Sequence, residues 1–177
     1  MITRQITIQG IVQGVGFRPF IKNLADSMHM KGSVINTSRG VIIKANLWDE
    51  ELDKFIKKIR KNAPALSHIV SIDVKDIEHI DYNNFTIEHS KDLGGITLIP
   101  PDMAICDECR SEILDIGERR FFYPFTNCTN CGPRYSIIEK LPYDRCSTTM
   151  KDFKMCDDCY NEYTDTNDRR YHAQPIA

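Results

Sequence analysis

Residues 5–28 read QITIQGIVQGVGFRPFIKNLADSM, and this stretch decides the fold of the first half of the chain. Polar and apolar residues alternate at its beginning, over 5–12, which predicts a β-strand. A glycine-rich turn follows, and Pro19 then falls in the first turn of a helix, where its missing N–H costs nothing. Apolar residues with helical spacing predict that this helix is amphipathic: Phe17, Phe20, Ile21, Leu24, Ala25 and Met28.

The remainder of the first half continues the alternation of strands and helices. Residues 33–37 and 41–47 predict a hairpin that turns near Arg39-Gly40. Asp49 is placed to cap a second helix, whose apolar face carries Leu52, Phe55, Ile56 and Ile59. Alternation around Val70, Ile72 and Val74 predicts a last long strand, and residues 85–87 an edge piece. The order β-α-β-β-α-β predicts an α+β fold of the ferredoxin-like type.

The glycine-rich turn predicts an anion site. A strand that runs through glycines into a helix start directs several backbone N–H groups toward one point, with the positive end of the helix dipole behind them. No Lys-Ser/Thr follows the glycines and no G-x-G-x-x-G is present, which excludes the usual nucleotide loops. Taken alone, a Gly-x-Gly is more often a tight turn beside a solvated arginine. The predicted phosphate-binding residues are Gln13, Gly14, Val15, Gly16, Phe17 and Arg18.

The string Gly10–Phe20, GIVQGVGFRPF, resembles the signature of the acylphosphatase family. The second motif of that family also appears, as GSVIN over Gly32–Asn36, followed by Gly40-Val41. The resemblance implies that Arg18 binds the phosphate and that Asn36 holds the attacking water. The chain departs from the family pattern at Arg39, where an acidic or polar residue is usual. Neither motif contains Cys or His, so no covalent intermediate on the protein is expected.

Composition separates the chain into two halves. The 177 residues are 41% hydrophobic and 27% charged, which excludes disordered and fibrous classes. Residues 1–91 carry a net charge of +3, whereas residues 92–177 carry −5 and all seven cysteines. The N-terminus has no signal-peptide pattern and no apolar run is long enough to span a membrane, so a cytoplasmic protein without membrane partners is expected. We predict an acylphosphatase-like domain over 1–91 and a zinc-finger region over 92–177.

The first four cysteines follow the pattern C-x2-C-x18-C-x2-C, the spacing of a closed tetrahedral zinc site. An odd cysteine count without an export signal argues against a disulfide framework. Zinc is therefore the expected cofactor, and nucleic acid is not an expected partner because this half is acidic and each tetrathiolate site adds further negative charge. The predicted ligands of this first module, about 102–138, are Cys106, Cys109, Cys128 and Cys131.

The acidic half contains an internal repeat with an offset of 50 residues. Cys106-Asp107-Glu108-Cys109 matches Cys156-Asp157-Asp158-Cys159, and Arg119-Arg120 matches Arg169-Arg170. The repeat predicts a second module, about 152–177, in which Cys156 and Cys159 are ligands. Adding the offset to the second cysteine pair of the first module predicts ligands just beyond Ala177, so we expect a fragment cut inside this module. Cys146 falls outside the repeat.

Together these motifs and the sequence between them resemble the N-terminal part of the hydrogenase-maturation carbamoyltransferase family, HypF. The segments that carry the resemblance are RRFFYPFTNCTNCGPRYSII at 119–138, LPYDR at 141–145 and RRYHAQP at 169–175. The resemblance implies an acylphosphatase-type hydrolase that converts carbamoyl phosphate to carbamate and phosphate, with structural zinc. It also implies a HypE-type partner for the full-length protein. The alternative is a non-catalytic anion-binding and scaffolding fragment that needs the missing adenylating and transferase domains.

Overall fold

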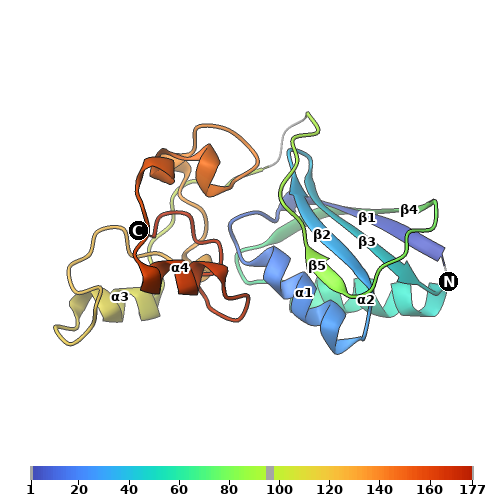
Figure 1. Ribbon diagram of the computed structural model, residues 1–177, viewed down its shortest axis with the longest axis horizontal. Helices are drawn as coiled ribbons and strands as arrows, with labels where there is room; N and C mark the ends of the chain where they lie inside the picture. The colour runs from blue at the N-terminus through green and yellow to red at the C-terminus, as the bar shows by residue number, and fades with distance from the viewer. Residues whose placement is uncertain (1, 95–97, 177) are drawn as a thin grey trace. The chain divides into compact units, whose positions relative to one another are not determined.

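The computed structural model describes residues 2–94 and 98–176, which fall into two compact units (Figure 1). One unit comprises Met1–Gln13 and Phe17–Leu98, and the other comprises Gly14–Gly16 and Ile99–Ala177. Contacts thus divide the chain at Leu98, whereas the boundary at 91 that composition suggests remains a prediction. No helix within the described ranges is both long and apolar enough to cross a membrane.

The first unit is a five-stranded sheet with two helices. Along the chain, its elements are β1 (Ile2–Ile11), α1 (Phe17–Ser27), β2 (Gly32–Thr37), β3 (Gly40–Leu47), α2 (Asp49–Asn62), β4 (His68–Ile77) and β5 (Phe85–Ile87). The strand order is β4-β1-β3-β2-β5. All neighbouring strands are antiparallel except β2 and β5, which are parallel. The predicted ferredoxin-like α+β arrangement is confirmed, and β5 is the predicted edge piece.

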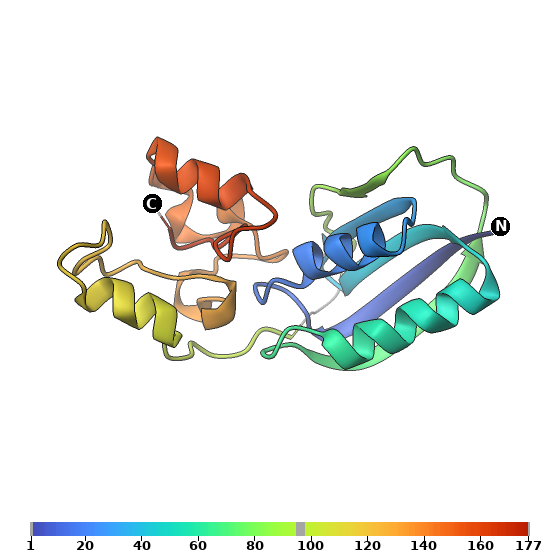
Figure 2. The same ribbon diagram turned by 90° about the horizontal axis from the view of Figure 1, so that it is seen from below.

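Helices α1 and α2 lie on the same face of the sheet (Figure 2). The apolar face of each helix packs on alternate residues of the central strands, which excludes water from the space between the two layers. On the strands, Ile6 is paired with Ile43 in the β1–β3 register, and both are fully buried. The helices contribute five side chains that are at most 1% exposed: Phe17, Ile21, Ala25, Phe55 and Ile59. The predicted helical spacing therefore marks the face that forms the core.

The β2–β3 hairpin requires glycine at the first residue of its second strand. Gly40 has a φ of +119°, and a Cβ at this position would lie 2.3 Å from the carbonyl oxygen of Ile8. A residue with a side chain would meet backbone there rather than a flexible group, so only glycine allows β1 and β3 to approach so closely.

The start of α2 differs from the prediction by one residue. Trp48, with an extended backbone, is the N-cap, and Asp49 is the first helical residue rather than the cap. The Trp48 backbone N–H donates to Glu51 Oε2 at 2.8 Å, which is the return half of a capping box. Asp49 instead pairs with Arg4, while three acidic residues in the first turn oppose the positive end of the helix dipole.

The second unit contains two short helices of equal length, α3 (Asp107–Leu114) and α4 (Asp157–Thr164), with 3-10 turns between them. Their surroundings repeat in detail. Cys106 and Cys156 are the N-caps, and Phe122 and His172 both have a φ of 52°. Backbone bonds recur at the same offset, for instance from Phe122 N–H to the Ile113 carbonyl and from His172 N–H to the Tyr163 carbonyl. The internal repeat in the sequence is therefore also a repeat in structure.

Candidate functional sites

The predicted phosphate loop follows β1 and leads into α1. Gly14 and Gly16 have φ values of +69° and +74°, the left-handed region that favours glycine. Such positions allow neighbouring backbone N–H groups to turn toward one side and form an anion-binding nest. The Gln13 side chain is buried, and its amide donates to the carbonyl oxygen of Thr37 at 2.7 Å. Its side chain thus ties the start of the loop to the β2–β3 hairpin, so a phosphate contact from Gln13 would come from its backbone.

Arg18 lies in the first turn of α1 and is only 6% exposed. Its Nη1 donates to Ser90 Oγ at 3.2 Å. A buried guanidinium must be compensated because its desolvation is costly, and the strongest compensation is an anion that it can bind through two N–H groups. The position of Arg18 at a helix N-terminus therefore suits a phosphate group.

Asn36 lies near the end of β2 and is 2% exposed. Its backbone carbonyl accepts the N–H of Lys91 at 3.0 Å, whereas its side-chain Oδ1 is buried without a hydrogen-bond partner among the residues that the structure describes. A buried acceptor without a partner costs about 1–3 kcal/mol. This cost is removed when Oδ1 accepts a hydrogen bond from a water or a substrate.

The segment after β5 links Arg18 to Asn36. It runs beside β2, where Glu88 N–H donates to the carbonyl of Val34 and Lys91 N–H donates to that of Asn36. Ser90, between them, accepts from Arg18. Sequence reasoning missed Ser90, because a single serine in a polar stretch carries no motif. The nearby Arg39, where the chain departs from the acylphosphatase pattern, donates through Nε to the carbonyl of Gly94 at 2.7 Å.

The four cysteines of the first module form one cluster. Their Sγ atoms all lie within 4.8 Å of one another, with Cys106 to Cys128 at 3.5 Å and Cys128 to Cys131 at 3.7 Å. Zinc–sulfur bonds of about 2.3 Å in a tetrahedron require sulfurs about 3.8 Å apart, so this donor set fits zinc. Hydrogen bonding among the thiols, from Cys128 first, raises the pKa of Cys109. Hydrogen bonds from Cys109 and Cys128 lower the pKa of Cys131 to about 3.

Cys156 and Cys159 are not brought to this cluster. Among the residues that the structure describes, only the first four cysteines form a group of three or more metal-ligating side chains within ligand distance. Cys159 is buried and Cys156 is exposed, and Arg119 donates to both sulfurs. Their role as ligands remains a prediction. Cys146 is exposed.

Comparisons with known proteins match both parts of the chain. The acylphosphatase family model matches residues 4–87, and the model described as the HypF finger matches 105–138 and 155–177. A carbamoyltransferase HypF of Synechocystis is 44% identical over 152 residues, 86% of this chain and 20% of that protein. The crystal structure of full-length HypF in the phosphate- and nucleotide-bound form superposes with a TM-score of 0.90 at 50% identity, over 99% of this chain and 23% of that one. The chain belongs to the HypF family.

The acylphosphatase unit of this HypF-family chain also matches proteins that consist of that unit alone. An acylphosphatase of Thermotoga petrophila is 36% identical over 86 residues, which are 48% of this chain and 94% of that protein. By contrast, the chain spans about a fifth of the length of the HypF relatives it matches. The acylphosphatase is therefore matched over nearly its whole length, while most of a HypF protein has no counterpart in this sequence.

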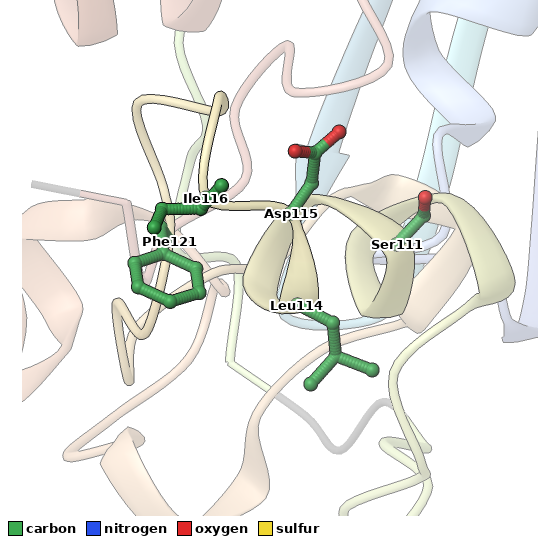
Figure 3. A pocket seen from close by; sticks show the side chains of 5 residues that line it. All are labelled: Ser111, Leu114, Asp115, Ile116 and Phe121. Atoms are coloured by element: carbon green, nitrogen blue, oxygen red, sulfur yellow. The ribbon is translucent and has the colours of Figure 1, made fainter.

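The HypF finger region has an open surface depression at the end of α3, with a volume of about 630 Å³ (Figure 3). It is lined by Ser111, Leu114, Asp115, Ile116 and Phe121. The Asp115 carboxylate accepts the backbone N–H of Gly117 at 2.9 Å and thus closes the turn after the helix. Asp115 is the one ionisable residue among the residues that line the depression.

Proposed function

We propose that the first unit of this HypF-family chain hydrolyses acyl phosphates, with carbamoyl phosphate as the substrate. The observation that carries the proposal is the placement of Arg18 and Asn36, which are both buried and joined through Ser90 and Lys91. Within the described part of the chain, Asn36 Oδ1 has no hydrogen-bond partner. An arginine at the start of a helix and a free amide oxygen are what in-line attack of water on a bound phosphoryl group needs. The match to whole acylphosphatases supports the reaction class.

In the proposed mechanism, the backbone N–H groups of the loop 13–17 and the Arg18 guanidinium bind the phosphoryl oxygens and offset their charge. Asn36 Oδ1 accepts a hydrogen bond from water and holds it in line with the scissile bond. Water forms the new P–O bond while the bond to the carbamoyl oxygen breaks, so carbamate leaves with the electron pair. The substrate is an activated mixed anhydride, so positioning and charge compensation suffice, and a substrate oxygen takes the proton from the water.

We propose zinc as the ion of the first module, where it would hold the chain between residues 106 and 131 in a closed structural site. Cys106, Cys109, Cys128 and Cys131 would supply four thiolates and leave no position for a substrate. In a longer HypF protein, the product carbamate would pass to an ATP-dependent carbamoyl transfer that ends on a HypE-type partner. That sequence of reactions, the hydrogenase-maturation role and the cytoplasmic location remain proposals for this chain.

Phosphate release from carbamoyl phosphate by the intact chain tests the proposal. Arg18→Ala should lower kcat/KM by about 10²–10³-fold, because one preorganised donor to developing charge is worth about 3–4 kcal/mol. Arg60→Ala, which removes an exposed arginine on α2, is the control and should leave the rate unchanged. Equal rates for the native and Arg18→Ala chains would overturn the hydrolase. Tight phosphate binding without turnover in the native chain would support the scaffolding alternative instead.

A further inference from the structure

In each of the two modules, an arginine contacts the cysteines of the other module. Arg119 Nη1, in the first module, donates to Cys159 Sγ at 3.2 Å and to Cys156 Sγ at 3.7 Å in the second. Arg169 Nη1, in the second, donates to Cys109 Sγ at 3.0 Å and to Cys106 Sγ at 3.9 Å in the first. The two contacts are equivalent, because each arginine and each cysteine in one contact lies 50 positions from its counterpart in the other.

The second arginine of each pair also contacts the other module. Arg120 pairs with Glu162, and Arg170 pairs with Glu112, which also holds Arg169. Arg120 and Arg170 are only 6% and 4% exposed, and their carboxylate partners are half-buried, so these ion pairs between the modules are only partly solvated. Reciprocal pairs of this kind are the pattern of a two-fold interface, formed here by two copies of one motif within a single chain.

A tetrathiolate zinc site carries a net charge of −2, and groups that donate hydrogen bonds to its sulfurs orient the ligands and offset that charge. In the first module such a donor comes from a residue 60 positions away in the sequence. Glu112 fixes the donor, because it accepts from Arg169 Nη2 while Nη1 faces the sulfurs. The four ligands of the first module therefore receive this hydrogen bond from the second module.

We propose that Arg169 is a positioning residue for the metal of the first module, and Arg119 the corresponding residue for the second, so that each module contributes to the metal affinity of the other. This inference rests on the proposed zinc site at Cys106, Cys109, Cys128 and Cys131. It goes beyond that site because it makes metal retention depend on a side chain outside the motif that binds the ion.

The test is the zinc affinity of the first site in the intact chain, measured by competition with a chromogenic chelator. Arg169→Ala should weaken binding about 10–100-fold, the usual effect of losing an outer partner of a metal ligand. Arg119→Ala is the matched control, since it removes the equivalent arginine and its ion pair between the modules but touches none of the four sulfurs. It should change affinity far less, and Arg169→Lys should restore only part of the loss.

A second measurement separates positioning from mere stability. With one equivalent of Co²⁺ in place of zinc, loss of an N–H to sulfur bond should shift the sulfur-to-metal charge-transfer band to lower energy in Arg169→Ala and leave it unchanged in Arg119→Ala. Equal effects of the two variants on both readouts, or none in either, would overturn the inference. A native chain that binds no zinc would overturn the metal assignment as well, so the two failures are distinguishable.

Discussion

For single residues, the burial of a side chain indicates its role more clearly than its residue type does. Arginine and asparagine are common surface residues, yet Arg18 and Asn36 are both nearly inaccessible, and the side-chain oxygen of Asn36 has no hydrogen-bond partner in residues 2–94 and 98–176. Arg120 and Arg170 are arginines beside aromatic residues, for which an ion-pair or packing role is the ordinary expectation. The structure confirms the ion pairs but places them inside the second unit.

Tyr143 gives a prediction for pH dependence at this scale. Burial raises the pKa of Tyr143 from 10.0 to about 12, and its oxygen accepts the backbone N–H of Arg134 at 3.1 Å. The unfolded chain loses the phenol proton near pH 10, whereas the folded chain keeps it, so this stabilisation is complete below pH 10 and is lost as pH rises to about 12. The free energy of unfolding should fall by about 2 kcal/mol more over this range than in Tyr143→Phe. A variant with the same slope as the native chain would contradict this.

At the scale of elements, α3 and α4 show which parts of the motif the fold needs. Their caps and backbone bonds are the same, but exposed Leu114 and Ile116 of the first module correspond to Thr164 and Thr166 of the second. Since the second module adopts the same turn with polar residues, the apolar ones are not required for folding. The apolar residues that are required pack on the cysteines, as Ile105 does.

Ile116→Thr should therefore change the stability of the metal-loaded chain by less than about 0.5 kcal/mol, because the side chain is 85% exposed. Ile105→Thr is the same substitution at a position packed against the cysteine cluster, and it should cost about 1–2 kcal/mol. Denaturant unfolding with zinc present measures both. A larger loss for Ile116→Thr than for Ile105→Thr would show that the depression at the end of α3 supports the fold.

At the scale of the whole molecule, the two units depend on different forces. The first has a core of aliphatic and aromatic residues between a sheet and two helices, and it contains no cysteine. The second has two eight-residue helices and short 3-10 turns, and two of its cores are built around cysteines. We expect a unit of this size with so little regular structure to depend on a metal for its stability.

Removal of the metal with a strong chelator should therefore unfold the second unit and leave the sheet of the first unit intact. Circular dichroism and amide exchange follow the two units. Added zinc should restore the second unit, whereas Mg²⁺, which prefers oxygen ligands, should not. Loss of the sheet signals on chelation would contradict this division.

The strands, the helices and the first cysteine cluster were predicted from the sequence because each depends on residues close together in the chain. Alternation over 5–12 and helical spacing over 17–28 reflect which side of an element meets the core. The C-x2-C pairs reflect the short span of a metal knuckle. The cap of α2 was misplaced by one residue, since Asp49 is a better capping residue by type than Trp48.

The sequence by itself determined the order of the elements, the glycine turn before Arg18, the repeat and the four-thiol cluster, because local spacing encodes each of them. The contacts of Ser90 with Arg18, 72 positions apart, and of Arg169 with Cys109, 60 positions apart, become visible only in the folded chain. Such contacts join side chains from elements that the fold alone brings together, and neither periodicity nor composition carries information about them. The repeat shows that the two arginine pairs are equivalent, but their exchange of partners follows from how the modules pack.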